Sequence, residues 1–168
     1  MIVIKDAMIL IHLAKTSVLE DSCDLFEMKL IPNEVWEETV KIGKEKGYPD
    51  AKLIEEIIDK NKIEVCKVDD NKLIERANDF NIQGGEAEAV ALYWEKEADF
   101  LATDDDNVRR KRVILELDII GTLSIIIKLF EEKKIDKDKV KVALDILGEV
   151  GWFSTAVLDK TKMEVGLI

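Results

Sequence analysis

The chain has 168 residues, of which 25 are basic and 36 acidic, so its formal charge is −11. This length suits one domain with a substantial core and excludes two domains of ordinary size. The excess of acidic residues argues against a broad nucleic-acid-binding face and leaves room only for a local basic patch. The content of 47% hydrophobic residues argues against a disordered chain.

The N-terminal stretch "MIVIKDAMILIHLAK" predicts a strand over residues 1–4 and a helix over residues 7–15. It is apolar enough to suggest a signal peptide, but we expect a strand and a helix instead, because Lys5, Asp6 and His12 interrupt the apolar run and no small-residue cleavage site follows. No stretch reaches the roughly 18 uninterrupted apolar residues of a membrane span, which predicts a soluble, cytoplasmic protein. Cys23 and Cys66 lack metal-ligand spacing and fit reduced thiols.

Apolar runs and helical spacing alternate along the rest of the chain. Further strands are predicted at residues 30–31, 63–68 and 99–103, with a fifth candidate at 117–121. Helices are predicted between and after them, at residues 33–46, 51–60, 72–80, 85–98, 122–134 and 136–150, with a short last helix from about residue 154.

This alternation predicts an α/β fold of three layers, α/β/α, around a central, mainly parallel sheet of four to five strands. Extra helices follow at the C-terminus. We treat residues 1–168 as a single domain, with the sheet and its helices over about 1–130 and a C-terminal helical extension over about 131–168.

Two acids follow predicted strands directly. Asp6 comes after the first strand, and Asp104 opens the run "DDD" after the fourth. In an open parallel sheet, ligands bind beyond the carboxyl ends of the strands, where the strand order reverses. We therefore expect these two carboxylates to be neighbours, although they lie 98 residues apart in the sequence.

The helix predicted over residues 33–46 offers a third acid. At about 100° per residue, its apolar side is centred between Val35 and Thr39. Glu37 points away from this side, whereas Glu38 lies at its border. Glu38 is therefore the best placed of the three acids that this helix offers, Glu34, Glu37 and Glu38.

The helix after "QGG" offers a fourth acid. Glu86 flanks its apolar side and lies in the first turn, where the helix dipole favours a negative charge. Glu88 is predicted to share the solvated side with Glu95. Glu86 is therefore the better candidate of this helix.

Each acid also has a purely structural interpretation. Asp6 can be the N-cap of the first helix, Glu86 a stabilising end group, and Asp104 to Asp106 a cap and a solvated turn. The functional interpretation depends on their occurring together, because crowded carboxylates stay ionised only if a cation compensates them. Oxygen ligands without His or Cys select Mg²⁺ or Mn²⁺, and the chemistry that such a site suits best is phosphodiester hydrolysis.

These pieces, in this order, resemble the PIN-domain nucleases, the family of the VapC-type toxins and of ribosomal-RNA maturation endonucleases. The resemblance is carried by "DAMILIHLAK", "IPNEVWEETV", "GEAEAVALYWEKEADFLATDDDNVRR" and "IIGTLSIIIK". It covers the chain to about the start of the last two helices. It implies an acidic quartet around one or two Mg²⁺ or Mn²⁺ ions.

The resemblance assigns these acids one by one. Asp6 matches the first acid, Glu38 the glutamate of the second motif, and Glu86 the third acid, which is usually an aspartate in the toxins. Glutamate in the setting "GEAEA" resembles a largely uncharacterised prokaryotic branch instead. For the fourth acid, the family's Thr-x-Asp pattern points to Asp105, whereas the strand-end argument favours Asp104, so both remain candidates. Asp106 is the weakest of the three, and Thr103 matches a hydroxyl position that supports a ligand or a metal-bound water.

A short basic run follows the acids. Arg109 and Arg110 are predicted to contact RNA phosphates, and Arg109 is the one expected nearest to the site. The same residues, with Lys111 and Arg112, also suit a structural role, because basic side chains complement a helix dipole.

The aromatic residues and the one histidine have structural interpretations. His12 lies on the first helix near Asp6 and is read as a partly buried structural residue. Trp36 and Trp94 lie on apolar helical faces and are interpreted as residues of the hydrophobic core. Trp152 and Phe153 are expected to anchor the C-terminal segment, or to form a dimer contact.

The leading hypothesis is a metal-dependent endoribonuclease that hydrolyses RNA phosphodiester bonds. It is either the toxin of a toxin–antitoxin pair, with a small antitoxin protein inserting near the acids, or a stand-alone RNA-processing enzyme, and the resemblance makes a homodimer the expected state. The alternative is a catalytically inactive PIN-like protein-interaction module. A haloacid-dehalogenase fold is disfavoured, because "KDAM" lacks a second aspartate two residues after the first.

Overall fold

The computed structural model describes residues 1–168 and places five strands in one sheet, in the order β3-β2-β1-β4-β5. The strands are β1 (Ile2–Lys5), β2 (Met28–Pro32), β3 (Glu64–Cys66), β4 (Phe100–Ala102) and β5 (Ile119–Ile120). Every neighbouring pair is parallel. The predicted three-layer α/β/α fold is confirmed, and the fifth candidate strand is real.

The strands are buried on both faces, as their continuous apolar runs require. Along β1, Val3 faces one hydrophobic cluster and Ile4 faces the other. In β2, Ile31 faces the same cluster as Val3, and Leu30 faces the same cluster as Ile4. Side chains of successive residues point to opposite faces of a strand, so each strand contributes to two separate cores.

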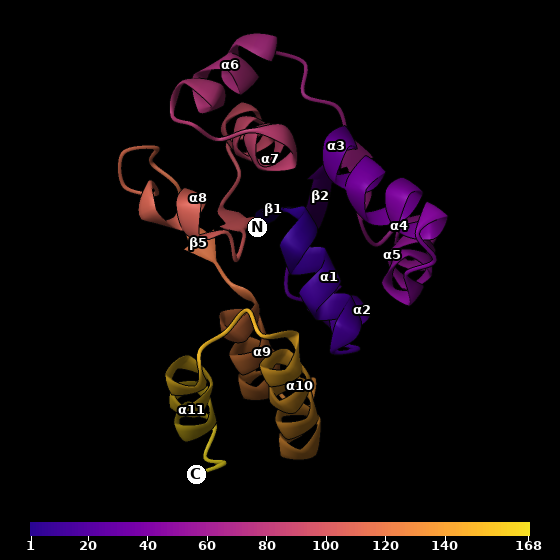
Figure 1. The fold of residues 1–168 in the computed structure, drawn as a ribbon, viewed down its shortest axis with the longest axis vertical. Helices are drawn as coiled ribbons and strands as arrows, with labels where there is room; N and C mark the ends of the chain where they lie inside the picture. Colours follow the sequence, from indigo (N-terminus) through magenta and orange to yellow (C-terminus); the bar gives the residue numbers. More distant parts are fainter.

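Two groups of helices cover these faces (Figure 1). The helices α6 (Asn71–Asp79), α7 (Gly84–Glu95) and α8 (Asp106–Arg110) cover the face of Ile4. On the face of Val3 lie α1 (Ala7–Lys15), α2 (Leu19–Cys23), α5 (Pro49–Asp59), α9 (Thr122–Glu131), α10 (Lys137–Val150) and α11 (Thr155–Glu164).

The helix predicted over residues 33–46 exists but is not uniform. It consists of α3 (Asn33–Trp36), a π-helical turn η1 (Glu37–Lys41) and α4 (Ile42–Glu45). A π turn accommodates an extra residue, so the side chains after it are rotated from their α-helical directions. The assumption of one α-helical period over this segment was therefore wrong.

The last third of the chain forms three helices that pack together at one end of the molecule (Figure 1). The first of them, α9, ends earlier than predicted, and α10 ends at Gly151, whose φ of 79° is the left-handed conformation that glycine adopts without strain. Buried residues of α10 and α11, such as Leu144 and Leu158, belong to the same cluster as Leu10 of α1.

The short helices α2 and α8 were not predicted, because five residues are too few to show a helical period. No helix of the protein combines the length and the apolar character needed to cross a lipid bilayer.

Candidate functional site

Asp6 lies at the reversal point of the sheet. It directly follows β1, whose neighbours are β2 on one side and β4 on the other. Its backbone N–H donates to the carbonyl of Ala102 at 3.1 Å, and its Oδ1 accepts from the backbone N–H of Ile9 at 2.9 Å. Asp6 is thus the N-cap of α1 and stands at the predicted ligand position at the same time.

The surroundings of Asp6 disfavour its charge. Only 3% of the residue is exposed, and this burial raises the pKa of its carboxyl to about 7. Hydrogen bonds from the Thr103 side chain and from Ile9 lower the pKa, whereas the charges of Asp104 and Glu86 raise it. The carboxyls of Asp6, Asp104 and Glu86 therefore interact electrostatically, although they come from three distant segments of the chain.

Asp104 is buried and held by hydrogen bonds from two helices. Its Oδ2 lies 2.7 Å from Nδ1 of His12 in α1 and also accepts from the Thr122 hydroxyl. Its Oδ1 accepts from the backbone N–H of Thr122 at 2.9 Å. The carboxylate is therefore fixed between the start of α9 and the middle of α1.

The sequence arguments missed two of these partners. His12 was considered able to approach the site but was interpreted as a structural residue, and Thr122 was not considered. A signal for Thr122 existed, because it follows Gly121 at the end of a predicted strand, the position that had singled out Asp6 and Asp104. The contact of His12 with Asp104 spans 92 residues and has no local signal.

The next two acids of the run are placed differently. Asp105 is the N-cap of α8, with Oδ2 accepting from the Val108 N–H at 2.9 Å, and its own N–H donates to Thr103 Oγ1 at 3.0 Å. Asp106 is exposed in the first turn of α8. Of the two candidates for the fourth acid, it is Asp104 whose charge acts on Asp6.

Glu38 lies in the π turn and approaches the start of α7. A Cβ atom on Gly85 would lie 2.8 Å from its Oε1, so only glycine leaves room for this carboxylate. Burial and the charge of Glu86 raise the pKa of Glu38, and a hydrogen bond from the Gly85 backbone lowers it. Glu38 and Glu86 are thus neighbours, and Glu86 lies within electrostatic reach of both Glu38 and Asp6.

The environment of Glu88 differs from the one predicted from helical spacing. It was predicted to lie on the solvated side of its helix, but it is half-buried, and its Oε1 accepts from the Glu34 N–H at 3.4 Å. Burial raises the pKa of this carboxyl. The tight packing of α3 on α7 covers a side that would be open on an isolated helix.

Together these acids form a row at the carboxyl edge of the sheet: Glu38, Glu86, Asp6 and Asp104. No three His, Cys, Asp or Glu side chains are close enough together to enclose a metal ion. The donor set nevertheless suits Mg²⁺ or Mn²⁺, because these ions prefer oxygen ligands and Mg²⁺ is usually held by one or two carboxylates and several waters. Burial and like charges raise the pKa of Asp6 and of Glu38, and this is the environment that a cation stabilises.

Most of the basic run is engaged by backbone carbonyls of the protein itself. Arg110 Nε donates to the carbonyl of Asp106 at 3.3 Å, Arg112 Nη1 to that of Arg109 at 2.7 Å, and Lys111 Nζ to that of Phe80. Arg109 is the exception. Its Nη1 lies 3.4 Å from the Thr103 carbonyl and 2.9 Å from the place of a Cβ on Gly121, which brings its guanidinium beside Asp104.

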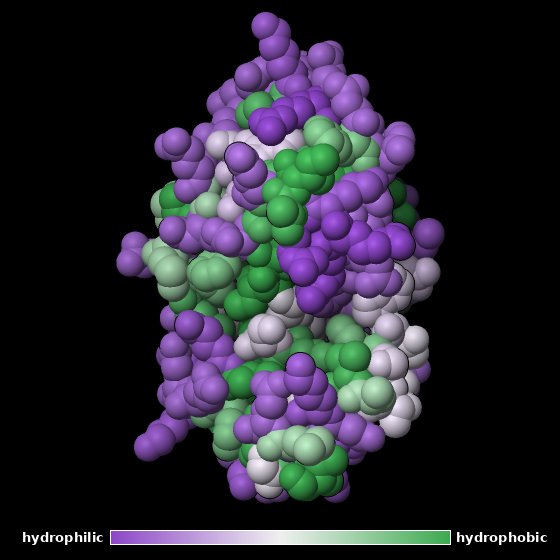
Figure 2. All heavy atoms as spheres, turned by 90° about the vertical axis from the view of Figure 1, so that its left-hand side faces the viewer, coloured by the Kyte–Doolittle hydropathy of each residue, from purple (hydrophilic) through white to green (hydrophobic).

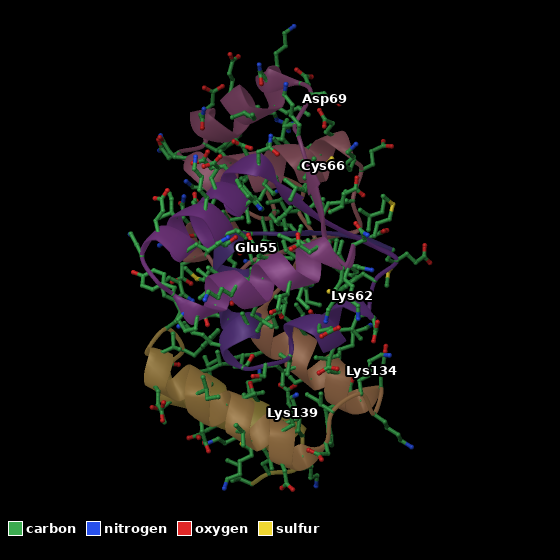
Figure 3. The ribbon with its side chains drawn as sticks, turned by 90° about the vertical axis from the view of Figure 1, so that its right-hand side faces the viewer. Glu55, Lys62, Cys66, Asp69, Lys134 and Lys139 are labelled. Carbon is green, nitrogen blue, oxygen red and sulfur yellow. The ribbon has the colours of Figure 1, made fainter.

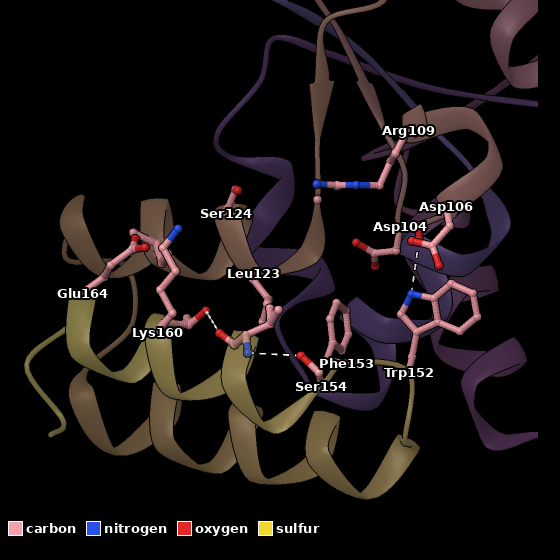
Figure 4. A pocket seen from close by; sticks show the side chains of 14 residues that line it. Asp104, Asp106, Arg109, Leu123, Ser124, Trp152, Phe153, Ser154, Lys160 and Glu164 are labelled. Carbon is pink, nitrogen blue, oxygen red and sulfur yellow. Dashed lines mark hydrogen bonds between the residues drawn. The ribbon is translucent and has the colours of Figure 1, made fainter. Parts of the chain in front are cut away.

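A pocket of about 510 Å³ opens next to Asp104. Its walls come from α8, the start of α9, residues 152–154 and α11 (Figure 4), and the molecular face shown in Figure 2 is hollowed between the sheet part and the C-terminal helices. Trp152 Nε1 donates to the Asp104 carbonyl at 3.2 Å, and the ring of Phe153 lies 5.3 Å from that of His12. These two aromatic residues attach the C-terminal segment to the acidic row.

Comparison with known proteins gives one match. The family model described as "DUF3368: PIN domain" matches residues 2–166. The match extends beyond the sheet core and includes the last two helices, which the sequence resemblance had left out. No curated protein and no solved structure matches the chain.

Proposed function

Since the chain belongs to the PIN-domain family, whose fold is of the nuclease type, we propose that it is a Mg²⁺- or Mn²⁺-dependent endoribonuclease that hydrolyses RNA phosphodiester bonds. One observation carries the proposal. Asp6, Asp104 and Glu86 come from three separate segments, and burial together with the charges of the other two raises the pKa of Asp6 at the reversal point of the sheet. Burying a carboxyl next to like charges costs stability and is typical of sites that hold a cation.

The proposed ligands are Asp6, Glu86 and Glu38, with Asp104 as the fourth acid. A divalent ion bound there lowers the pKa of water and stabilises negative charge on a phosphate oxygen. Asp104 is oriented by His12 and Thr122, so its carboxylate needs no rearrangement before it acts. The Thr103 hydroxyl stands beside Asp6, where it can bond a ligand or a water molecule.

The net charge of −11 repels an RNA backbone, so the substrate must be attracted locally. Arg109 is exposed and lies beside Asp104, which makes it the main proposed phosphate contact. Arg110, on the next position of the same short helix, is proposed to assist.

Calorimetric titration with Mn²⁺ tests this proposal. We expect the wild-type protein to bind the ion, and the Asp6→Asn and Asp104→Asn variants to lose most of this binding while staying folded. Asp138→Asn, which removes one exposed acid from the first turn of α10, is the matched control and should bind like the wild type. Binding that is indifferent to both site changes would refute a metal site at this edge of the sheet.

A second candidate function is a PIN-like protein-interaction module without catalysis. Two observations favour it: no three acids enclose a metal position, and the Asp104 carboxylate is already engaged by His12 and Thr122. This function predicts a folded protein, expected as a homodimer, that does not bind Mn²⁺ in the same titration.

Within the nuclease proposal, a toxin and a processing enzyme differ in their genetic context and partner. A toxin requires a small antitoxin protein, which would insert a segment near the acidic row. A gene immediately upstream that encodes a DNA-binding antitoxin would support the toxin role, and co-purification of that protein with this chain would test it.

A further inference from the structure

The pocket beside Asp104 is not explained by metal binding. It extends away from the acidic row between α8 and α11, and Asp104 is the only acid of the row among its lining residues. Its volume of about 510 Å³ is in the range of small-ligand sites. It is therefore large enough for one nucleotide unit next to the proposed site of cleavage.

The pocket holds an aromatic ring that is both fixed and uncovered. Trp152 is 42% exposed, although its indole N–H is bonded to the Asp104 carbonyl at 3.2 Å. Phe153 follows it among the lining residues (Figure 4), and its ring centroid lies 5.3 Å from that of His12. An exposed indole held by a directional hydrogen bond is arranged as a stacking surface, because its orientation is set before any ligand arrives.

The charges of the lining favour a neutral ligand over a phosphate. Two cations, Arg109 and Lys160, are outnumbered by three acids, Asp104, Asp106 and Glu164. A phosphate would be repelled by this balance, whereas a flat neutral ring that carries both donors and acceptors can bond to both kinds of group. Lys160 has free donors for such a ring, because it is exposed and its ammonium group makes no hydrogen bond or ion pair.

We propose that this pocket is a nucleobase subsite, which receives the base of a single-stranded nucleotide next to the scissile phosphate. The inference rests on the proposed nuclease function, since it takes the RNA strand to pass along the acidic row. Trp152 and Phe153 supply stacking, Lys160 supplies hydrogen bonds to ring acceptors, and the acids accept from exocyclic amines, while Arg109, beside Asp104, remains the contact of the adjacent phosphate. The C-terminal helices thereby select single-stranded RNA, whose bases are free to leave the stack.

The test uses NMR of the indole N–H groups in EDTA, so that no metal-dependent cleavage occurs. The probes are an eight-nucleotide single-stranded RNA of mixed sequence and a base-free sugar-phosphate strand of the same length. The Trp152 resonance is identified by its absence in Trp152→Phe. We expect the RNA to shift this resonance and the base-free strand to leave it unchanged.

Two substitutions test the lining. Phe153→Leu keeps apolar volume and the bond from Trp152 to Asp104 but removes a ring, and we expect RNA affinity to fall about tenfold, the loss typical of one stacked base. Lys160→Gln should weaken RNA binding about threefold, the loss of one hydrogen bond. Lys162→Gln is the matched control, because it removes the same charge from α11 at a position that does not line the pocket.

The outcomes separate the subsite from the nuclease. Equal shifts by both probes, or no shift of Trp152 with RNA, would overturn the subsite. Wild-type Mn²⁺ binding in the separate titration would then still support the nuclease. A base-dependent shift that the two lining variants weaken and the control retains would support the subsite, and absence of Mn²⁺ binding in that case would count against the nuclease alone.

Discussion

Acidic residues occupy two contrasting environments in this protein. On the face shown in Figure 3, which labels Glu55 and Lys62, acids are in contact with water and pair with lysines. Glu20 lies 2.8 Å from Lys62, and Glu55 lies 3.0 Å from Lys44. At the carboxyl edge of the sheet, Asp6 is buried without a basic partner. The lysines lower the pKa of Glu20, whereas burial raises that of Asp6 to about 7.

The contrast shows which of the two regions is unfavourable for folding. Exposed ion pairs contribute little and are screened by salt, so the charged face is nearly neutral for folding. The crowded edge is unfavourable for folding, and the fold keeps it in spite of this cost. A destabilising cluster at the reversal point of a parallel sheet is a stronger indication of function than any count of acids along the chain.

The largest expected effect concerns Asp6 in the metal-free protein. Its folded pKa is raised from 3.8 to about 7, so the stability it contributes as a neutral acid is complete below pH 3.8 and is lost as the pH rises through about 7. Asp6→Asn mimics the neutral acid and still caps α1. It should therefore be more stable than the wild type at pH 8 by up to about 4 kcal/mol, and no more stable at pH 4.

Urea unfolding in EDTA at the two pH values measures this difference. Asp138→Asn, at an exposed position, should change the stability at neither pH. If Asp6→Asn and the wild type lose stability equally between pH 4 and pH 8, the crowded edge does not carry the cost assigned to it.

Lys5 extends the comparison to a buried cation. It is fully buried, its Nζ donates to Ser22 Oγ at 3.1 Å, and burial lowers its pKa from 10.5 to about 8. The stability that it contributes when neutral is present above pH 10.5 and is lost as the pH falls through about 8. Lys5→Met should therefore stabilise the protein at pH 7 by about 2 kcal/mol, after allowance for the lost hydrogen bond.

The gain from Lys5→Met should shrink as the pH approaches 10.5, which urea unfolding at pH 7 and pH 10 can follow. Lys72→Met removes an exposed lysine and serves as the control. A gain that is independent of pH would show that packing, and not the charge of Lys5, is responsible.

A smaller effect is expected for Gly85→Ala, which should weaken metal binding without lowering the stability of the fold. The Cβ of Gly85→Ala would displace the Glu38 carboxylate, since it would lie 2.8 Å from Oε1. Because the side-chain end can move, the helix should keep or gain up to about 1 kcal/mol of stability, while Mn²⁺ affinity should fall about tenfold. Gly148→Ala is the control, since its Cβ would meet Leu158 at an ordinary 3.6 Å. Unchanged Mn²⁺ binding in Gly85→Ala would remove Glu38 from the ligand set.

The smallest effect is expected on the charged face. Glu20→Gln removes the partner of Lys60 and Lys62, but all three side chains are in contact with water. We expect a slight loss of stability at low salt that disappears in 1 M NaCl, measured by urea unfolding. A loss that persists in high salt would show that exposed pairs do contribute to the fold, and would weaken the contrast with the acidic edge.

Much of the fold was predictable because its signals are local. Apolar runs followed by Asp6 and by Asp104 identified strand ends, and the rule for parallel sheets made these two acids neighbours. The choice of Glu38 over Glu37 used the helical period alone, and that of Glu86 over Glu88 used the helical period and the helix dipole. The structure places Glu38 beside Glu86, but the assumed period failed for Glu88, which the packing of α3 on α7 covers, and for the segment of Glu38, which contains a π turn.

The sequence by itself determined the element order, the parallel sheet and the acids at its edge, since each depends on the period of apolar residues or on the end of a strand. Only the tertiary structure decided three contacts: His12 and Thr122 bond to Asp104, the Glu38 carboxylate occupies the space next to Gly85, and the Trp152 indole donates to the Asp104 carbonyl. These contacts join segments up to 92 residues apart. Their geometry depends on how whole helices pack, and no local pattern along the chain records it.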